Sequence, residues 1–301
     1  MNAGEIEVIH PDWPAPRGVR AAFTLRGGGV SRPPFDSLNL GLRVGDDSQA
    51  VVENRRRVRI CLGLPAEPNW LTQVHGSSVV TLDRAAADQA QAAHRAGGAH
   101  QAQGAHQAVP TQADAAISRR SGVVCAIQVA DCMPVLFAAR DGAAVGAAHA
   151  GWRGLAGGVL EATVAELAAG QPGVPADRLI AWMGPAIGRE HFEVGEEVRA
   201  AFVERDAEAA SAFARNARGR WQCDLYGLAR RRLATAGVRE VYGGGWCTYG
   251  DASRFFSYRR DGQCGRTAAL IWIEPAGGGS TGPLTGDERL LKAAVVSPQQ
   301  G

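Results

Sequence analysis

The sequence is poor in lysine and has no long apolar run. Lys292 is its only lysine, and basic and acidic residues nearly balance, which gives a formal net charge of +2. This balance excludes a field strong enough to make nucleic acid or an acidic membrane surface the main partner. Apolar stretches stay far below the roughly 20 residues that a membrane-spanning helix needs. We therefore expect neither a nucleic-acid-binding protein nor a membrane protein.

Cysteine patterns of the disulfide type are absent as well. The six cysteines stand apart and form no CxxC pair: Cys61, Cys125, Cys132, Cys223, Cys247 and Cys264. A chain of 301 residues with 46% hydrophobic residues can build a core without cross-links. Residues 1–16 have neither the basic start nor the apolar segment of a secretion signal. These features predict a cytoplasmic protein with reduced thiols.

Strand-like and helix-like segments alternate along the chain. Apolar runs at residues 123–129, 135–138 and 143–148 predict buried strands, which we expect to form the central sheet. Helical spacing over residues 48–62 predicts a helix that Asp47 or Ser48 can cap. This alternation favours a mixed α/β fold.

A second helix is predicted over residues 155–167, where apolar residues recur at helical spacing. The glycine-rich residues 151–154 open it directly after a predicted strand. Free backbone N–H groups and the helix dipole then point the same way, so we expect an anion-binding site at this helix start.

Residues 84–112 differ from the rest because they repeat alanine, glutamine and histidine and lack large apolar residues before Val109. Such a segment cannot bury enough surface to offset its ordering entropy, so we expect a low-complexity surface insertion. The expected division of the chain is an N-terminal extension at 1–20, one catalytic domain at 21–275 that carries this insertion, and a tail at 276–301.

Four histidines remain outside the insertion: His10, His75, His149 and His191. His75 and His149 each end a strand-like run just before a glycine or an alanine-glycine pair, and Cys132 ends another. Two imidazoles and one thiolate suit Zn²⁺ with an open fourth position, which is typical of a catalytic site. A cysteine nucleophile, Cys132 activated by His149, is the alternative, and the spacing does not separate the two.

Several longer motifs occur in a fixed order between residues 21 and 273. They are Phe23-Thr24-Leu25-Arg26-Gly27-Gly28-Gly29-Val30-Ser31, Ser37-Leu38-Asn39-Leu40-Gly41, Gln73-Val74-His75-Gly76, Ala130-Asp131-Cys132-Met133-Pro134, Ala148-His149-Ala150-Gly151-Trp152-Arg153-Gly154, Gly184-Pro185-Ala186-Ile187-Gly188, Phe192-Glu193-Val194-Gly195 and Phe255-Phe256-Ser257-Tyr258-Arg259-Arg260. In this order they resemble the YfiH-type laccase-domain family. The insertion at 84–112 is the clear departure.

The resemblance implies a single-domain, mixed-sheet α/β sandwich with a zinc site made by His75, Cys132 and His149. It implies a purine nucleoside phosphorylase that acts on adenosine, inosine, guanosine and methylthioadenosine with phosphate, and that also deaminates adenosine. A related role in the family is amidase-type editing of misincorporated serine in cell-wall precursors. The fold also resembles that of cysteine hydrolases, which keeps Cys132 as a nucleophile open.

The older family label, polyphenol oxidase, can be weighed against the histidines of this chain. Multicopper chemistry needs a mononuclear site and a trinuclear cluster, usually built from His-x-His pairs, and the sequence contains none. We therefore expect zinc, with copper as the less favoured metal. A purely structural metal is a further alternative, in which Cys125 or Cys247 closes the site as a fourth ligand.

Phosphorolysis requires an anion contact and groups that orient the nucleoside. We expect Arg26, Arg153 or the helix start at Gly154 to hold the phosphate, and Asn39 and Gln73 to orient the nucleoside. Asp131 precedes a proposed ligand, where it can either hold an imidazole tautomer or cap the turn. The sequence leaves the oligomeric state open.

Overall fold

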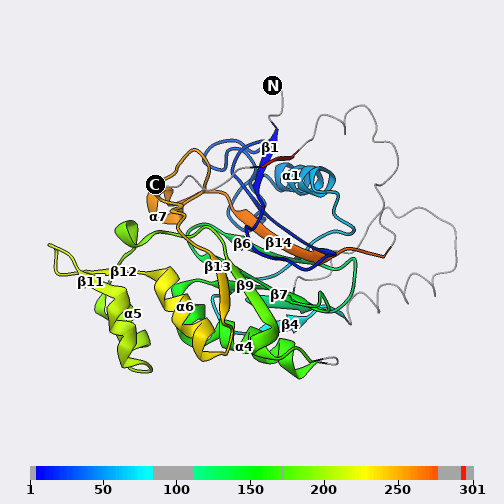
Figure 1. The fold of residues 1–301 in the computed structure, drawn as a ribbon. Coiled ribbons are helices and arrows are strands. Elements are labelled where there is room, and N and C mark those ends of the chain that lie inside the picture. The colour runs from blue at the N-terminus through cyan, green and yellow to red at the C-terminus, as the bar shows by residue number, and fades with distance from the viewer. Residues whose placement is uncertain (1–4, 84–110, 171–172, 277–292, 296–301) are drawn as a thin grey trace, which may run out of the picture.

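Two six-stranded sheets stack face to face at the centre of the molecule (Figure 1). The computed structural model describes residues 5–83, 111–170, 173–276 and 293–295. The first sheet has the spatial order β15 (Ala293–Val295), β1 (Ile6–Ile9), β2 (Val19–Thr24), β14 (Thr267–Ile273), β6 (Val124–Val129) and β3 (Asn69–Trp70). The second has the order β13 (Glu240–Gly243), β9 (Leu179–Met183), β7 (Met133–Ala139), β8 (Val145–Ala150), β5 (Ala115–Ser118) and β4 (Val79–Thr81).

Both sheets are mixed. Most neighbouring strands run antiparallel, whereas β1 and β15, β3 and β6, β4 and β5, and β9 and β13 pair in parallel. A small third sheet contains β10 (Glu193–Val194), β12 (Trp221–Cys223) and β11 (Phe213–Arg215). The predicted mixed-sheet α/β sandwich is therefore confirmed.

The core lies between the two large sheets and on both of their outer faces. Strand β7 shows why, because all seven of its residues are buried and successive side chains point to opposite faces. Leu136 and Ala138 pack between the sheets, against Ile127 of β6. Val135 and Phe137 pack on the other face, in the cluster that includes the helices.

Helices cover the two outer faces (Figure 1). On the first sheet lies α1 (Ser48–Cys61), which begins where the Asp47 side chain accepts a hydrogen bond from the backbone of Gln49, so the predicted cap is confirmed. The second sheet is covered by α3 (Trp152–Gly157), α4 (Val159–Ala169) and α6 (Leu225–Thr235), whereas α5 (Glu196–Val203) packs against η3 and the small third sheet. Shorter elements are α7 (Tyr258–Asp261), η1 (Ala176–Arg178), η2 (Arg189–His191) and η3 (Ala207–Ala212). Within the described ranges, no helix combines the length and hydropathy needed to cross a bilayer.

Three expectations about these elements are wrong. The runs expected to share a central sheet are divided, with β6 in the first sheet and β7 and β8 in the second. The chain crosses from one sheet to the other at residues 130–132, where Asp131 has a φ of +81°. The single helix expected over 155–167 is two helices, because Gly158 adopts a φ of +91° between α3 and α4. The strand expected before His75 ends at Trp70.

Most of the expected insertion at residues 84–112, and most of the expected tail at 276–301, lie outside the described residues. Residues 6–9, inside the expected N-terminal extension, form β1 and pair with β2.

Candidate metal centre and active site

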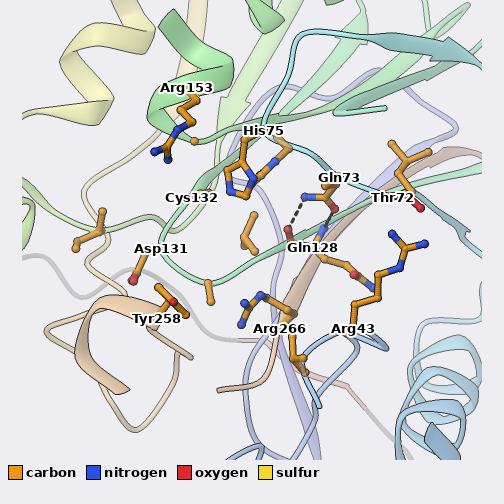
Figure 2. Close-up of a pocket in the computed structure, with 18 of the residues that line it drawn as sticks. Arg43, Thr72, Gln73, His75, Gln128, Asp131, Cys132, Arg153, Tyr258 and Arg266 are labelled. Carbon is orange, nitrogen blue, oxygen red and sulfur yellow. Dashed lines mark hydrogen bonds between the residues drawn. The ribbon is translucent and has the colours of Figure 1, made fainter. Parts of the chain in front are cut away.

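His75, Cys132 and His149 meet at one point although they are far apart in the sequence. Their ligand atoms all lie within 4.8 Å of one another, and the two imidazole rings meet edge to face with centroids 4.7 Å apart. His149 lies on β8, opposite Pro134 of β7, so the β7–β8 pairing brings Cys132 beside it. His75 comes from the loop between β3 and β4 and points into the same space (Figure 2).

Asp114 holds this group together. Its carboxylate is completely buried and accepts hydrogen bonds from His149 Nδ1 at 2.9 Å and from the backbone N–H groups of Val74, His75 and Gly76 at 3.2, 2.9 and 2.7 Å. Burial raises the pKa of Asp114, but the hydrogen bonds from His149 and this backbone outweigh burial and lower the pKa overall. With Nδ1 engaged, Nε2 of His149 is the nitrogen left for a metal.

Two non-glycine residues of the site adopt the left-handed backbone conformation. His75 has a φ of +63° and Asp131 a φ of +81°, which costs on the order of 1–3 kcal/mol each. The hydrogen bond from the His75 backbone N–H to the Asp114 carboxylate stabilises the left-handed conformation of His75. Asp131 is fixed because its carboxylate accepts from Thr248 Oγ1 and from the backbone N–H of Arg259, both at 2.6 Å. Asp131 therefore caps the crossing loop, and Asp114 is the carboxylate that sets the imidazole tautomer.

The donor set and the space around it fit a zinc ion. Two imidazoles and one thiolate are ligands that Zn²⁺ prefers, and three protein ligands leave a fourth position open. A Cβ on Gly151 would lie 2.6 Å from Cys132 Sγ and 3.3 Å from a ring carbon of His75, so only glycine leaves this space free. Among the described residues, the group contains neither Cys125 nor Cys247. This argues against a structural site closed by a fourth protein ligand.

Cys132 and His149 form an ion pair in the protein without metal. Burial raises the pKa of Cys132, but the charge of His149 and hydrogen bonds with both histidines outweigh it and lower the pKa to about 6. Burial lowers the pKa of His149, but the Cys132 thiolate and Asp114 outweigh it and raise the pKa to about 9. Near neutral pH the sulfur is a thiolate, the form that both a metal ligand and a nucleophile require.

A cavity of about 640 Å³ opens in front of the three ligands (Figure 2). Five arginines line it: Arg43, Arg55, Arg153, Arg259 and Arg266. Asp131 is the only acidic residue among the described residues that line it, and its carboxylate is already engaged. Aromatic side chains form further parts of the wall: Trp70, Trp152, Phe192 and Tyr258. The cavity therefore offers a positive field and apolar ring surfaces beside a metal-binding group.

Gln73 and Arg153, two of the predicted substrate contacts, line this cavity. The amide of Gln73 exchanges two hydrogen bonds of 2.8 Å with the backbone of Gln128, so its orientation is fixed. Arg153 is exposed, and its guanidinium lies 4.3 Å from the centre of the Trp152 ring.

Arg26 and Asn39, the other two predicted contacts, lie outside the cavity. The Arg26 guanidinium donates to the backbone oxygens of Asp36 and Ala252. Asn39 is completely buried, and its side-chain oxygen accepts from the backbone N–H groups of Gly41 and Arg266. Both side chains are therefore occupied by the chain itself, and Asn39 acts only by positioning two residues that line the cavity.

Helix α3 begins at Trp152 after Gly151, and both residues line the cavity, so the anion contact at this helix start stays a prediction, but Gly154 is not at the start. Gly154 lies inside α3, which has six residues, and a Cβ there would meet the backbone oxygens of Gly76 and His149 at 2.9 and 3.1 Å. This glycine is needed for close packing of α3 against strand β8, which carries His149, and the loop that carries His75.

The sequence reasoning missed Asp114, Arg43, Arg266 and Tyr258. For Asp114 a signal existed, because it is a single carboxylate directly before the apolar residues 115–118 of a buried strand. The other three belong to loops whose approach to the cavity depends on the tertiary fold.

Comparison with known proteins places the chain in a family. The family model described as multi-copper polyphenol oxidoreductase laccase matches residues 20–274. The chain belongs to this laccase-domain family. Its relatives include a purine nucleoside phosphorylase of Pseudomonas aeruginosa, 51% identical over 267 residues that cover 88% of this chain and 98% of the relative. Another is the purine nucleoside phosphorylase YfiH of Escherichia coli, 46% identical, with 89% of this chain and 99% of YfiH covered.

Solved structures agree with this assignment. A protein of Neisseria meningitidis superposes with a TM-score of 0.76 at 44% identity, covering 89% of this chain and all of that one. YlmD of Geobacillus stearothermophilus also reaches 0.76, at 31% identity, covering 87% of this chain and 94% of YlmD. The predicted membership in the YfiH-type laccase-domain family is thus confirmed.

Proposed function

We propose that this laccase-domain protein is a zinc-dependent purine nucleoside phosphorylase. Its substrates are adenosine, inosine, guanosine and methylthioadenosine, each with inorganic phosphate, and adenosine deamination is a side activity. The observation that carries the proposal is the three-ligand group of His75, Cys132 and His149 facing a cavity lined by arginines. The names of the Pseudomonas and Escherichia relatives support the same activity.

Zinc is the metal that these donors favour, and copper is the less favoured alternative that the family's description suggests. A mixed set of two imidazoles and a thiolate with an open position suits a single zinc ion, whereas a multicopper oxidase needs several histidine-rich copper sites. When bound, zinc would supply a Lewis acid that polarises an oxygen next to the reacting carbon.

The chain's own residues supply binding and orientation. Arg43 and Arg153 are exposed on the cavity wall, and neither guanidinium has a hydrogen-bond partner among the described residues, so both are available to phosphate. Arg266 is fixed by the backbone oxygens of Cys264 and Gly265 and adds positive charge to the wall. Tyr258 is 61% exposed and offers a ring surface to a purine, while the fixed amide of Gln73 shapes the wall beside His75.

A cysteine hydrolase is the second candidate, because the pKa of Cys132 is lowered and the thiol lies between two imidazoles. Under this hypothesis the protein is an amidase, for instance one that removes misincorporated serine from a cell-wall precursor. Metal dependence separates the two readings, since a thiolate held by zinc is no longer free to attack.

The deciding experiment incubates zinc-loaded protein with adenosine in the presence and absence of phosphate. We expect adenine and ribose 1-phosphate only with phosphate, inosine as a minor product of deamination, and loss of all products in His149→Ala but not in His10→Ala. Activity toward serine-containing precursor that survives metal removal, with no phosphate-dependent release of adenine, would support the hydrolase instead.

The division into an extension at 1–20, a catalytic domain at 21–275 and a tail at 276–301 is part of the same proposal, supported by the family match to residues 20–274. A cytoplasmic location is proposed too, because all six cysteines are free thiols.

A further inference from the structure

A second cysteine and histidine lie side by side outside the cavity. Cys247 Sγ is 3.4 Å from Nδ1 of His191, which ends the short helix η2. The pair belongs neither to the metal-binding group nor to the residues that line the cavity. Neither side chain is used by the proposed reaction.

The backbone is arranged around the Cys247 sulfur. The N–H groups of Gly188 and Gly250 both donate to Sγ at 3.3 Å. A Cβ on Gly188 would lie 3.1 Å from Sγ, and one on Gly250 would lie 3.6 Å from Sγ and from a ring carbon of His191. The Gly188 contact is tight for a side chain, so glycine at this position lets its N–H approach the sulfur, whereas a Cβ on Gly250 would make only an ordinary contact.

His191 is held in place against the sulfur. Its ring stacks on Tyr249 with centroids 4.5 Å apart and an interplanar angle of 22°. The imidazole is exposed and Cys247 is only partly buried, so small solutes can reach the pair. When Nδ1 carries a proton, three N–H groups surround one sulfur atom.

The other thiols outside the metal site lack this environment. Burial raises the pKa of Cys125, Cys223 and Cys264, and it raises the pKa of the partly buried Cys61 to about 11. These four are therefore protonated near neutral pH, and protonated thiols are poor nucleophiles.

We propose that Cys247 is a reactive thiol that hydrogen peroxide modifies, with His191 as its proton partner. The thiolate sulfur attacks one peroxide oxygen, so that an S–O bond forms and the O–O bond breaks. Sulfur loses two electrons and becomes a sulfenic acid, and the departing oxygen takes the proton of the His191 imidazolium and leaves as water. A small thiol such as glutathione then displaces water from the sulfenic acid and forms a mixed disulfide.

The site is one residue from the scaffold of the metal centre. Thr248 follows Cys247, and its hydroxyl donates to the Asp131 carboxylate that fixes the loop before Cys132. An oxygen or a glutathione added to Cys247 would disturb the two hydrogen bonds that Gly188 and Gly250 donate to the sulfur. We expect modification to displace the neighbouring Thr248 and the loop that it holds.

The test treats the zinc-loaded wild-type protein with hydrogen peroxide, traps sulfenic acid with dimedone and quantifies each cysteine peptide by mass spectrometry. Cys61 is the internal control, because it is also partly buried but has no histidine. We expect the Cys247 adduct to form roughly tenfold or more faster than the Cys61 adduct, because burial raises the pKa of Cys61, whereas Cys247 has an imidazole at 3.4 Å as a proton partner. An equal or slower rate at Cys247 would overturn the proposal, whatever the enzymatic activity turns out to be.

Two variants test the role of the imidazole. His191→Gln should slow labelling of Cys247 several-fold, whereas His10→Gln, a change at another exposed histidine, should leave the rate unchanged. Circular dichroism establishes that both variants are folded, and the wild-type comparison with Cys61 does not depend on them. Unchanged labelling in His191→Gln would refute the assigned partner.

Discussion

At the scale of a single residue, Asp114 connects the two histidines of the proposed zinc site. Its buried carboxylate orients the His149 ring and also receives the backbone of the loop that carries His75. A neutral amide at this position would keep the size but lose the charge, and its N–H₂ end would face donors. The ligands would remain in the chain while their orientation was lost.

Asp114→Asn should therefore weaken zinc binding by about 10–100-fold. It should also lower the free energy of unfolding by about 1–3 kcal/mol, because buried donors lose their acceptor. Competition with a chromophoric chelator measures the first effect and urea denaturation the second. Asp12→Asn, at an exposed aspartate, is the control that should change neither. Zinc affinity equal to that of the wild type would show that Asp114 does not position the ligands.

The ion pair of Cys132 and His149 predicts a pH window for the metal-free protein. The pKa of Cys132 is lowered, so its contribution to stability is present above the ordinary thiol pKa of 9 and is lost as pH falls through about 6. The pKa of His149 is raised, so its contribution is present below the ordinary 6.5 and is lost as pH rises through about 9. Both charges exist together between about 6 and 9.

Denaturation midpoints of metal-free wild-type protein and of Cys132→Ala, measured across this range, test the window. The difference between the two proteins should be largest between about 6 and 9 and should shrink on both sides. A difference that stays constant with pH would mean that the thiolate and the imidazolium do not form in the folded protein.

Arg153 is the predicted phosphate contact that the structure leaves in the cavity. Arg153→Gln should raise the KM for phosphate about tenfold or more, because a charged hydrogen bond contributes roughly 1.5–3 kcal/mol. The KM for adenosine should change much less. Arg32→Gln, at an exposed arginine that does not line the cavity, is the control. Equal effects on both KM values would assign Arg153 a structural role.

A site residue could be predicted from the sequence only where the residues that position it lie nearby in the chain or where the family resemblance identifies it. His75, Cys132 and His149 were found because few histidines exist outside the insertion and the family resemblance carries them. Arg26, one of the alternatives for the phosphate contact, lies outside the cavity and donates to the backbone of Ala252, a contact from the far end of the chain that the sequence does not reveal. Arg43 and Arg266 were missed because their loops reach the cavity only in the folded protein.

At the scale of elements, Gly151 lies where β8 ends and α3 begins. The missing side chain leaves the space that Cys132 Sγ and the His75 ring occupy. Gly157 lies in the same short helix, but a Cβ there would meet nothing within 4 Å. The two glycines therefore form a matched pair for one substitution.

Gly151→Ala should lower the zinc content of the purified protein well below one ion per chain and remove the activity with it. Gly157→Ala should keep both, and it should be neutral or stabilising by up to about 1 kcal/mol. Metal analysis of the two proteins prepared in parallel is the measurement. Full zinc occupancy in Gly151→Ala would contradict the assigned geometry.

Local signals predicted elements well and predicted their assembly poorly. Asp47 caps α1 as expected, because capping is decided within one turn. We expected β6, β7 and β8 in one sheet because consecutive strands usually neighbour each other. Here the left-handed backbone at Asp131 turns the chain into the other sheet, so β6 is separated from β7 and β8. The position of Asp131 is fixed by Thr248 and Arg259, which no local pattern reveals.

At the scale of the molecule, the metal-binding group forms only when the two sheets are stacked. His149 lies on the second sheet, Cys132 lies where the chain crosses between the sheets, and His75 lies in the loop that leads from β3 of the first sheet to β4 of the second. An unfolded chain keeps these ligands far apart, so it cannot offer the same site. We therefore expect zinc binding and the packing of the sandwich to be linked.

Zinc should in consequence raise the thermal midpoint of the whole protein. At a free zinc concentration about a thousandfold above the dissociation constant, linkage gives about 4 kcal/mol of stabilisation, which corresponds to a rise of several degrees in Tm. Scanning calorimetry of chelator-treated protein titrated with zinc measures the rise, and Cys132→Ala should show little of it. A wild-type Tm that does not change when zinc is added, or an equal rise in Cys132→Ala, would mean that the metal does not bind at the junction of the two sheets.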